Sequence, residues 1–327
     1  MVTAGLKRRL LRRPKAHVRL LGWEELSTRE FDAWRTLRAS NPVLDSPYFD
    51  PTYMAVVNET GSPICVIVAY DADGSVSALL PGNLRGGRFG PAGEPGTDFQ
   101  GPIVHPDRPV DPQSLFVDGI DEIYFDQLLT VTGFEPWVIR QYDAPTIDLT
   151  GGLDAYLDRA PRAGRKHLGV AGRRAAMAER ELGPLRFTAD SRNPGDLAQL
   201  VAWKYGQYAR TGRDQRPLVP PERYFRLLET RSPEFSGILS TLHLGDRLIA
   251  AYFNIRSRHV IHGWVQSHDG EFAKLMPGWM MMREVIAAAP TLGLQRFDLG
   301  MGGEEYKRWV KTGESYVHRV SLTRQAP

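Results

Sequence analysis

Cysteine is almost absent from this sequence, because Cys65 is the only one among 327 residues. No intrachain disulfide can form, and a metal site built from cysteines is excluded. Cys65 stands in the apolar run ICVIVAY, where we expect a buried, protonated thiol with a structural role. We therefore expect a protein that holds no metal.

Long apolar runs are also missing. No stretch approaches the ~20 apolar residues that span a bilayer, and no apolar segment of a secretory signal follows the basic N-terminus. The hydrophobic content of 42% and the charged content of 24% are typical of a globular protein. The sequence thus predicts a cytoplasmic protein with a full core and no membrane span, and its oligomeric state cannot be read.

Excess charge is small, at a net +3, which disfavours a general nucleic-acid binder. The basic residues are nevertheless clustered, with six in the nine residues from Lys7 to Lys15 and a second run from Arg159 to Arg180. We interpret residues 1–16 as a basic tail. Such a tail can contact acidic lipid or RNA, but a solvated arm explains it better.

The pattern of residues 17–150 predicts a first α/β unit. Ser27 and Glu30 form a capping box before a helix, and Asp50 with Pro51 begins a second one. A long glycine- and proline-rich loop is expected over 82–112. The other expected elements are strands at 17–21, 64–70, 76–80 and 137–141 and a helix at 118–132.

Residues 151–183 predict a basic linker helix, and 184–327 then repeat the order of the first unit. The expected strands cover 185–189, 237–244, 247–256, 259–266, 296–299 and 316–322, and the expected helices cover 193–208, 221–230 and 277–289. We therefore predict an α/β protein with two copies of one fold, each a mixed sheet flanked by helices.

Five segments carry a family resemblance: SPYFDPTYM, GTDFQG, AWKYGQYARTG, GDRLIAAYFNIRS and DLGMGGEEYKRW. In this order, they resemble the CelD-like (cellulose-biosynthesis-associated) acetyltransferases of the GNAT superfamily. Those proteins are double-GNAT chains related to the Fem aminoacyltransferases. The resemblance implies two tandem GNAT domains and an acyl-CoA or aminoacyl donor, and it allows the last strand to return to the first domain.

The glycine turn after Asp298 departs from that family. Relatives carry an Asp before the Glu, whereas this turn reads Gly300-Met301-Gly302-Gly303-Glu304. A role of that aspartate is either absent here or taken by Glu304. This departure is the main support for an alternative, a catalytically silent binding module in an envelope or polysaccharide system.

A donor site is expected where the apolar helix of 277–289 begins. The first N–H groups of a helix have no partner within the helix and bind phosphate, and a glycine there lets a pyrophosphate approach the backbone. The same residues also fit an ordinary helix cap. The candidate donor residues are Lys274, Met276, Pro277, Gly278 and Trp279.

Catalytic candidates lie on the third strand of the meander and around the glycine turn. His262 can act as a general base or as a structural histidine, and Asp298 can orient the turn or accept a proton. Tyr306 can protonate a departing thiolate. Lys307 can stabilise the oxyanion or the leaving group, and Fem relatives place a functional lysine in a comparable stretch.

The acceptor is expected between AWKYGQY, the GTDFQG loop and the meander. Alternation predicts that His262, Trp264 and Gln266 share one face of their strand. The candidate substrate-binding residues are Trp203, Lys204, Gln207, Tyr208, Asp98, Gln100, Trp264 and Gln266.

The hypothesis that follows is an N-acyltransferase that moves an acyl group directly from acyl-CoA to an amine of a small molecule or biosynthetic intermediate. A Fem-like transferase that uses aminoacyl-tRNA is the alternative enzyme. The lack of a long heptad arm counts against tRNA, whereas the basic linker helix keeps tRNA open. Neither the acceptor nor the acyl-chain length can be read.

Overall fold

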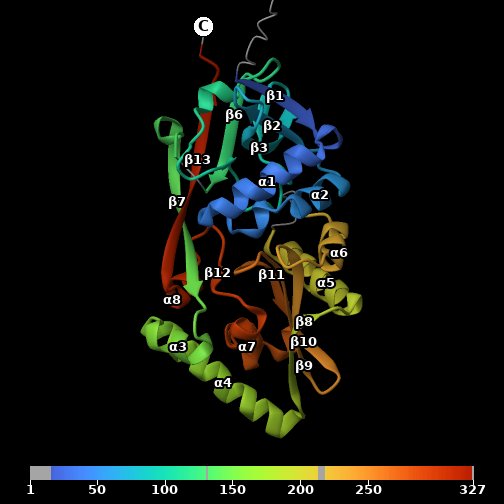
Figure 1. Cartoon of the computed structure of the whole chain (residues 1–327). Helices are drawn as coiled ribbons and strands as arrows, with labels where there is room; N and C mark the ends of the chain where they lie inside the picture. The colour runs from blue at the N-terminus through green and yellow to red at the C-terminus, as the bar shows by residue number, and fades with distance from the viewer. Residues whose placement is uncertain (1–15, 130–131, 213–217, 326–327) are drawn as a thin grey trace, which may run out of the picture.

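The computed structural model describes residues 16–129, 132–212 and 218–325. Almost all of the proposed basic tail lies outside the described residues. Within them, no helix has the length and apolar character needed to cross a bilayer. The chain is built on one mixed sheet with helices on both faces (Figure 1).

The first half contains two helices and seven strands. The capping box before α1 is present, because the Glu30 carboxylate accepts the Ser27 N–H at 3.0 Å. Asp50 accepts the Thr52 N–H at 2.8 Å and begins α2. The bounds are β1 His17–Gly22, α1 Thr28–Ser40, α2 Pro51–Glu59, β2 Cys65–Tyr70, β3 Val76–Arg85, β4 Arg88–Gly90, β5 Ile103–Val104, β6 Glu122–Leu128 and β7 Val138–Asp148.

The second half begins with the predicted basic helical segment, which forms two helices. The meander and the helix after it are also present as predicted. The bounds are α3 Gly152–Arg159, α4 Arg162–Leu182, β8 Leu185–Ser191, α5 Pro194–Thr211, α6 Pro221–Glu229, β9 Ser236–Leu244, β10 Arg247–Arg256, β11 Val260–His268, α7 Pro277–Ala288, β12 Arg296–Asp298, α8 Glu305–Val310 and β13 Gly313–Thr323.

The helix predicted over 118–132 is wrong, because this segment holds strand β6. Ile123 and Phe125 alternate with more exposed neighbours, which is the period of a strand, and the segment pairs with β13. The loop predicted over 82–112 is also more ordered than expected. It contains the end of β3 and all of β4 and β5, and a short 3-10 helix begins at its last residue, Pro112.

The sheet runs without a break through both halves in the order β1-β2-β3-β4-β6-β13-β7-β12-β11-β10-β9-β8, with β5 beside β3. Among the strands of the described residues, only the pairs β4–β6 and β11–β12 are parallel. The last strand, β13, lies between β6 and β7, two strands of the first half. Strand β7 in turn pairs with β12, so it joins the two halves.

Core residues alternate between the two faces of this sheet. In β2, Val66 and Val68 belong to a cluster shared by α1, α2, α5 and α6, whereas Ile67 faces a cluster with β6 and β13. In the second half of the chain, α3, α4 and α7 cover Ile261 and Phe297 on the other face of the sheet. Helices of both halves therefore pack into the same cluster on the first face (Figure 1).

Strand β11 contains a bulge that changes the predicted alternation. Phe253 pairs with Val265 and Asn254 pairs with Gly263, so Trp264 is the extra residue. His262 faces Tyr48, but Gln266 donates to the Gly278 carbonyl of α7 at 3.0 Å. The prediction that His262, Trp264 and Gln266 share one face is therefore wrong for Gln266, because the bulge shifts the alternation.

Candidate functional site

A cavity of about 670 Å³ opens where β11 ends, between α5 and the start of α7. The cavity brings together one segment that we predicted to bind the donor and another that we predicted to bind the acceptor. Gly278 comes from the expected donor site, and Trp203, Lys204 and Gln207 come from the expected acceptor helix. The remaining lining residues are Ala202, Gly206, Arg210, Gln266, Ser267, His268 and Gly270.

The start of α7 forms one wall of this cavity, and the first N–H groups of a helix can attract an anion. Met276 caps the helix in the left-handed conformation, with φ 62°, and Pro277 occupies the first turn. Gly278 comes next and lines the cavity. Lys204 and Arg210 add positive charge from α5. Burial lowers the pKa of His268, so this imidazole is neutral at pH 7 and serves as a hydrogen-bonding group.

Four of the five proposed donor residues do not line this cavity, and Met276, the helix cap, is one of them. Lys274 is exposed, and its carbonyl accepts a hydrogen bond from the Arg174 guanidinium. Trp279 stacks on His167 of α4, with ring centroids 4.7 Å apart. Pro277 is buried and supplies only the geometry of the helix start. At the start of α7, the cavity wall is therefore formed by Gly278 and the backbone around it.

The second part of the site is a pair of side chains from different halves of the chain. His262 Nε2 lies 2.9 Å from Asp98 Oδ2. The His262 side chain is 0% exposed and that of Asp98 is 32% exposed, so Asp98 presents the accessible oxygen. The rings of Tyr48 and Phe99 meet His262 edge-on, with centroids 4.8 and 5.1 Å away.

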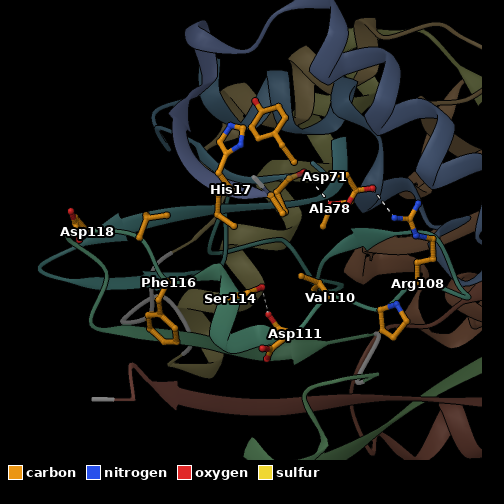
Figure 2. A pocket seen from close by; sticks show the side chains of 16 residues that line it. His17, Asp71, Ala78, Arg108, Val110, Asp111, Ser114, Phe116 and Asp118 are labelled. Atoms are coloured by element: carbon orange, nitrogen blue, oxygen red, sulfur yellow. Dashed lines mark hydrogen bonds and ion pairs between the residues drawn. The ribbon is translucent and has the colours of Figure 1, made fainter. Parts of the chain in front are cut away.

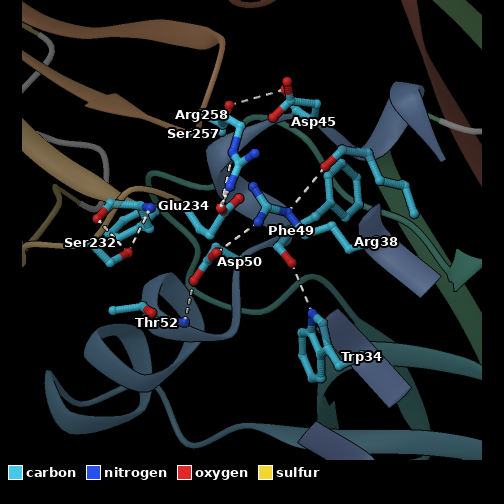
Figure 3. A network of polar contacts seen from close by, with 12 residues as sticks. Trp34, Arg38, Asp45, Phe49, Asp50, Thr52, Ser232, Glu234, Ser257 and Arg258 are labelled. Atoms are coloured by element: carbon cyan, nitrogen blue, oxygen red, sulfur yellow. Dashed lines mark hydrogen bonds and ion pairs between the residues drawn. The ribbon is translucent and has the colours of Figure 1, made fainter. Parts of the chain in front are cut away.

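A polar network fixes the segment that carries Tyr48 (Figure 3). Trp34 donates to the Phe49 carbonyl at 2.8 Å, and the Arg38 guanidinium is 2.8 Å from Asp50. The Ser257 hydroxyl donates to the Asp45 carbonyl at 3.3 Å, so the second half contributes as well. The segment is thus held on both sides of Tyr48. This network borders a cavity of about 910 Å³ whose lining includes two ion pairs, Arg38–Asp50 and Arg258–Glu234.

The loop that carries Asp98 is anchored at both ends. At one end, Arg223 of α6 donates to the carbonyls of Gly93 and Pro95 at 2.8 and 3.1 Å. At the other end, Gln100 donates to Asp126 of β6 at 3.1 Å and exchanges backbone bonds with that strand. Gln100 is buried, so the structure places this candidate substrate residue as an anchor of the loop.

The glycine turn closes over the His262–Asp98 pair. A Cβ on Gly300 would lie 2.9 Å from Asp98 Oδ2 and 3.4 Å from His262 Nε2. Lys307 holds this turn, since its ammonium donates to the carbonyls of Gly300 and Met301 at 3.2 and 2.9 Å. Only 6% of the Lys307 side chain is exposed, and the ammonium also pairs with Glu304 at 3.1 Å.

Asp298 and Tyr306 lie on either side of the glycine turn, in different surroundings. Asp298 stands opposite His262 in the parallel register, yet its buried carboxylate is bound by the Arg296 guanidinium at 2.8 Å. Burial and the neighbouring Glu304 raise the pKa of Tyr306 to about 12. Tyr306 therefore keeps its proton across the neutral range and can donate it.

Strand β11 connects the two parts of the site. Gln266, which lines the cavity, comes four positions after His262 on β11. Four positions along a strand correspond to roughly 13 Å. β12 pairs with β11 only as far as His262, because β12 ends at Asp298. An extended donor can lie along β11, with its phosphates at α7 and its reactive end beside Asp98.

Another cavity, of about 690 Å³, lies beside β1 in the first half (Figure 2). Its charged groups are already used by the fold. Asp71 pairs with Arg108 at 2.7 Å, and Asp111 accepts the Gln113 N–H at 3.0 Å. No cluster of three His, Cys, Asp or Glu side chains that could hold a metal occurs among residues 16–129, 132–212 and 218–325.

Sequence reasoning did not assign four residues that shape the site: Tyr48, Arg210, Arg223 and Gly300. Arg210 follows Gln207 by three residues on α5. The sequence therefore predicts that the two side chains lie on the same face of the helix. Tyr48 and Arg223 act through contacts with the other half of the chain. Such contacts leave no local pattern in the sequence.

Residues 165–308 match the family described as "Acetyltransferase (GNAT) domain". This part of the chain runs from α4 into α8 and includes β11, β12 and the start of α7. This part of the chain is therefore similar to a GNAT acetyltransferase domain, and the chain is an acyltransferase. No protein of curated function shows a significant sequence match.

Solved structures share the fold of the whole chain at low identity. FemX has a TM-score of 0.60 and 10% identity over 92% of this chain and 96% of that one. The C-terminal domain of a putative lysylphosphatidylglycerol synthetase from Agrobacterium fabrum has a TM-score of 0.55 and 13% identity over 90% and 92%. A tandem GNAT protein from the clavulanic acid biosynthesis pathway has a TM-score of 0.50 and 10% identity over 95% and 100%. The predicted α/β fold of tandem GNAT type is confirmed.

Proposed function

We propose that the chain transfers an acyl group from acyl-CoA to the amine of a small molecule or biosynthetic intermediate by direct attack. The observation that carries this proposal is the position of the Asp98–His262 pair. It lies where the pairing of β11 with β12 ends, while the cavity with the start of α7 lies at the far end of β11. The pair is thus placed for the reacting end of a donor whose phosphates bind at α7.

In the proposed reaction, the Asp98 carboxylate takes a proton from the ammonium form of the acceptor. The amine nitrogen then attacks the thioester carbonyl, so the C–N bond forms and the C–S bond breaks. His262 holds the Asp98 carboxylate in place from its buried position. Asp98 is therefore the group that we assign as general base.

Two other charges develop during the transfer. The bulge leaves Trp264 out of the β10 ladder, and we assign its backbone N–H to the oxyanion of the tetrahedral intermediate. The departing thiolate takes its proton from Tyr306, which stays protonated at neutral pH, and the phenolate regains a proton from the attacking nitrogen as the amide forms. Lys307 shapes the glycine turn through its carbonyl contacts, and Asp298 with Arg296 supports β12.

The donor assignment is supported by the chemistry of the cavity. Lys204 and Arg210 lie beside the helix start, which suits the pyrophosphate of CoA. The resemblance to CelD-like acetyltransferases belongs to this proposal and leaves the acceptor open. In the cavity, Trp203 and Gln207 thus serve the donor side, while the acceptor approaches Asp98 from the first half.

Binding of acetyl-CoA and of longer acyl-CoAs tests the proposal, measured by calorimetry and by thermal shift. A ligand at 100 times its Kd stabilises the folded protein by about 2.7 kcal/mol. We expect such a shift for the wild type and a Kd at least about tenfold weaker for Arg210→Glu. The control Arg186→Glu changes an exposed arginine on β8 and leaves the Kd unchanged. A wild-type protein that binds no acyl-CoA would contradict the proposal and favour the silent binding module.

A further inference from the structure

Helix α4 presents a charged stripe that the proposed reaction does not use. Six exposed positions follow one another at spacings of 4, 3, 4, 3 and 4 residues: Arg162, Lys166, Gly169, Arg173, Ala176 and Arg180. Spacings of three and four place side chains on one face of a helix. The stripe extends over roughly 27 Å at 1.5 Å per residue.

The opposite face of α4 is the one that the fold buries. Gly164, Leu168, Ala171 and Ala178 are buried there, and α4 packs on α7 and α8. Between Arg162 and Ala178 the helix has no acidic residue. Among the described residues, none of Arg162, Lys166 and Arg173 forms an ion pair within 4.0 Å. The charge of the stripe is therefore not neutralised within the fold.

The arrangement of the stripe fits a helical partner. Basic residues and small residues alternate along it, so Gly169 and Ala176 lie between long cationic side chains. A spacing that averages 3.5 residues is the seam along which two helices pack. The small residues allow a close approach, and the cations on either side meet acidic side chains. A second copy of this chain would place like charges against each other, which is unfavourable.

The stripe is joined to the donor site through the inner side of the same helix. Arg174 donates to the Lys274 carbonyl in the segment just before α7. The residue after Lys166, His167, stacks on both Trp279 of α7 and Trp309 of α8, with centroids 4.7 and 4.6 Å away. A protein docked on the stripe would therefore be separated from the start of α7 by the width of α4. In Figure 1, α4 runs along the lower edge of the molecule, away from the first half.

We propose that the α4 stripe docks an acidic helix of a carrier protein that presents the acyl donor on a phosphopantetheine arm. This inference rests on the proposed function and names a macromolecular form of its donor. The chemistry is unchanged: the amine forms the C–N bond, the C–S bond breaks, and the carrier's thiol leaves with the proton from Tyr306. The phosphate of the arm would bind at the start of α7.

The experiment compares binding of three probes to the full chain: an acetylated acyl carrier protein with an acidic recognition helix, acetyl-CoA, and total tRNA. The test variant carries Arg162→Glu, Lys166→Glu and Arg173→Glu. The control variant carries Arg19→Glu, Arg140→Glu and Arg186→Glu, three exposed arginines on β1, β7 and β8. Both variants reverse three charges, so they differ only in where the charge is changed.

We expect the test variant to weaken carrier binding at least about tenfold and to leave the Kd of acetyl-CoA within about twofold. The control variant should bind both as the wild type does. An unchanged carrier Kd in the test variant would overturn the inference. So would tRNA binding that is tighter than carrier binding and lost in the test variant. If acetyl-CoA fails to bind even the wild type, the proposed CoA-dependent function is what fails.

Discussion

Arg223 of α6 donates a hydrogen bond to the carbonyl of Gly93 at 2.8 Å, although 130 residues separate them in the chain. The guanidinium is completely buried, and its other partners are the Pro95 carbonyl and the hydroxyls of Thr60 and Ser62. Every one of these partners is neutral, and burial lowers the pKa of Arg223. The second half of the chain thus holds the loop that presents Asp98.

Arg223→Met should destabilise the protein and lower its activity. The substitution leaves two buried carbonyls without their donor, and we expect a loss of about 2 to 4 kcal/mol in the free energy of unfolding. Denaturant titration measures this loss. Arg226→Met, one turn further on α6, removes only exposed ion pairs with Glu59 and Glu229, so it should cost less than about 1 kcal/mol. Equal losses in both variants would contradict the role of Arg223 as the anchor.

Gly300→Ala should reduce activity more than stability. Its new Cβ would lie 2.9 Å from Asp98 Oδ2, and its φ of 71° strains any residue other than glycine. We expect a fall in kcat/KM of at least about tenfold, because the Asp98–His262 pair is displaced. Gly303→Ala is the matched control, since nothing lies within 4 Å of its Cβ. A Gly300→Ala enzyme with wild-type kinetics would show that the turn does not position the pair.

Glu94 should give the loop a pH-dependent stability. Burial and the neighbouring Asp126 raise the pKa of Glu94 from 4.5 to about 7. Because its pKa is higher in the folded state, Glu94 contributes stability that is complete below pH 4.5 and is lost as the pH rises through about 7. Glu94 keeps part of its surface in water, so we expect an effect below about 1 kcal/mol.

Unfolding of wild type and Glu94→Gln, measured from pH 5 to pH 8, tests this expectation. The glutamine cannot ionise, so the variant should gain stability relative to the wild type as the pH rises. Glu135→Gln, at another exposed carboxylate of the first half, should show no such trend. A constant difference between wild type and Glu94→Gln over this range would refute the assignment.

Lys307→Met should loosen the glycine turn. The substitution removes a donor from the carbonyls of Gly300 and Met301, and we expect a loss of about 2 to 3 kcal/mol together with lower activity. Lys311→Met is the control, because that lysine pairs with Glu314 nearer the surface and should cost less than about 1 kcal/mol. Full stability with abolished activity in Lys307→Met would instead favour a direct catalytic role.

Much of the fold could be predicted from local patterns. The capping box at Ser27, the proline at position 51 and the alternation of the meander each fix an element by short-range chemistry. The segment Glu122–Leu128 shows where this fails. Its strand is stabilised by pairing with β13, almost 200 residues later in the chain, and composition alone suggested a helix.

The candidate site could be predicted only in pieces. The residue types at Asp98, His262 and Gly278 indicated chemistry, and all three lie at the site that we propose. Their partners were not readable, because Asp98 meets His262 across 164 residues and the bulge at Trp264 turns Gln266 toward α7. Tertiary contacts also placed Gln100 as an anchor of the loop.

The most direct test of the account is the rate of thiol release from acetyl-CoA with an amine acceptor, compared between the wild type and Asp98→Asn. Asparagine keeps the size of the side chain but cannot take the ammonium proton, so we expect a fall in kcat of about 100-fold or more with an unchanged Kd for acetyl-CoA. The control Asp246→Asn, in the exposed turn between β9 and β10, should act as the wild type does. An Asp98→Asn enzyme that releases thiol at the wild-type rate would contradict the assignment of Asp98 as the base.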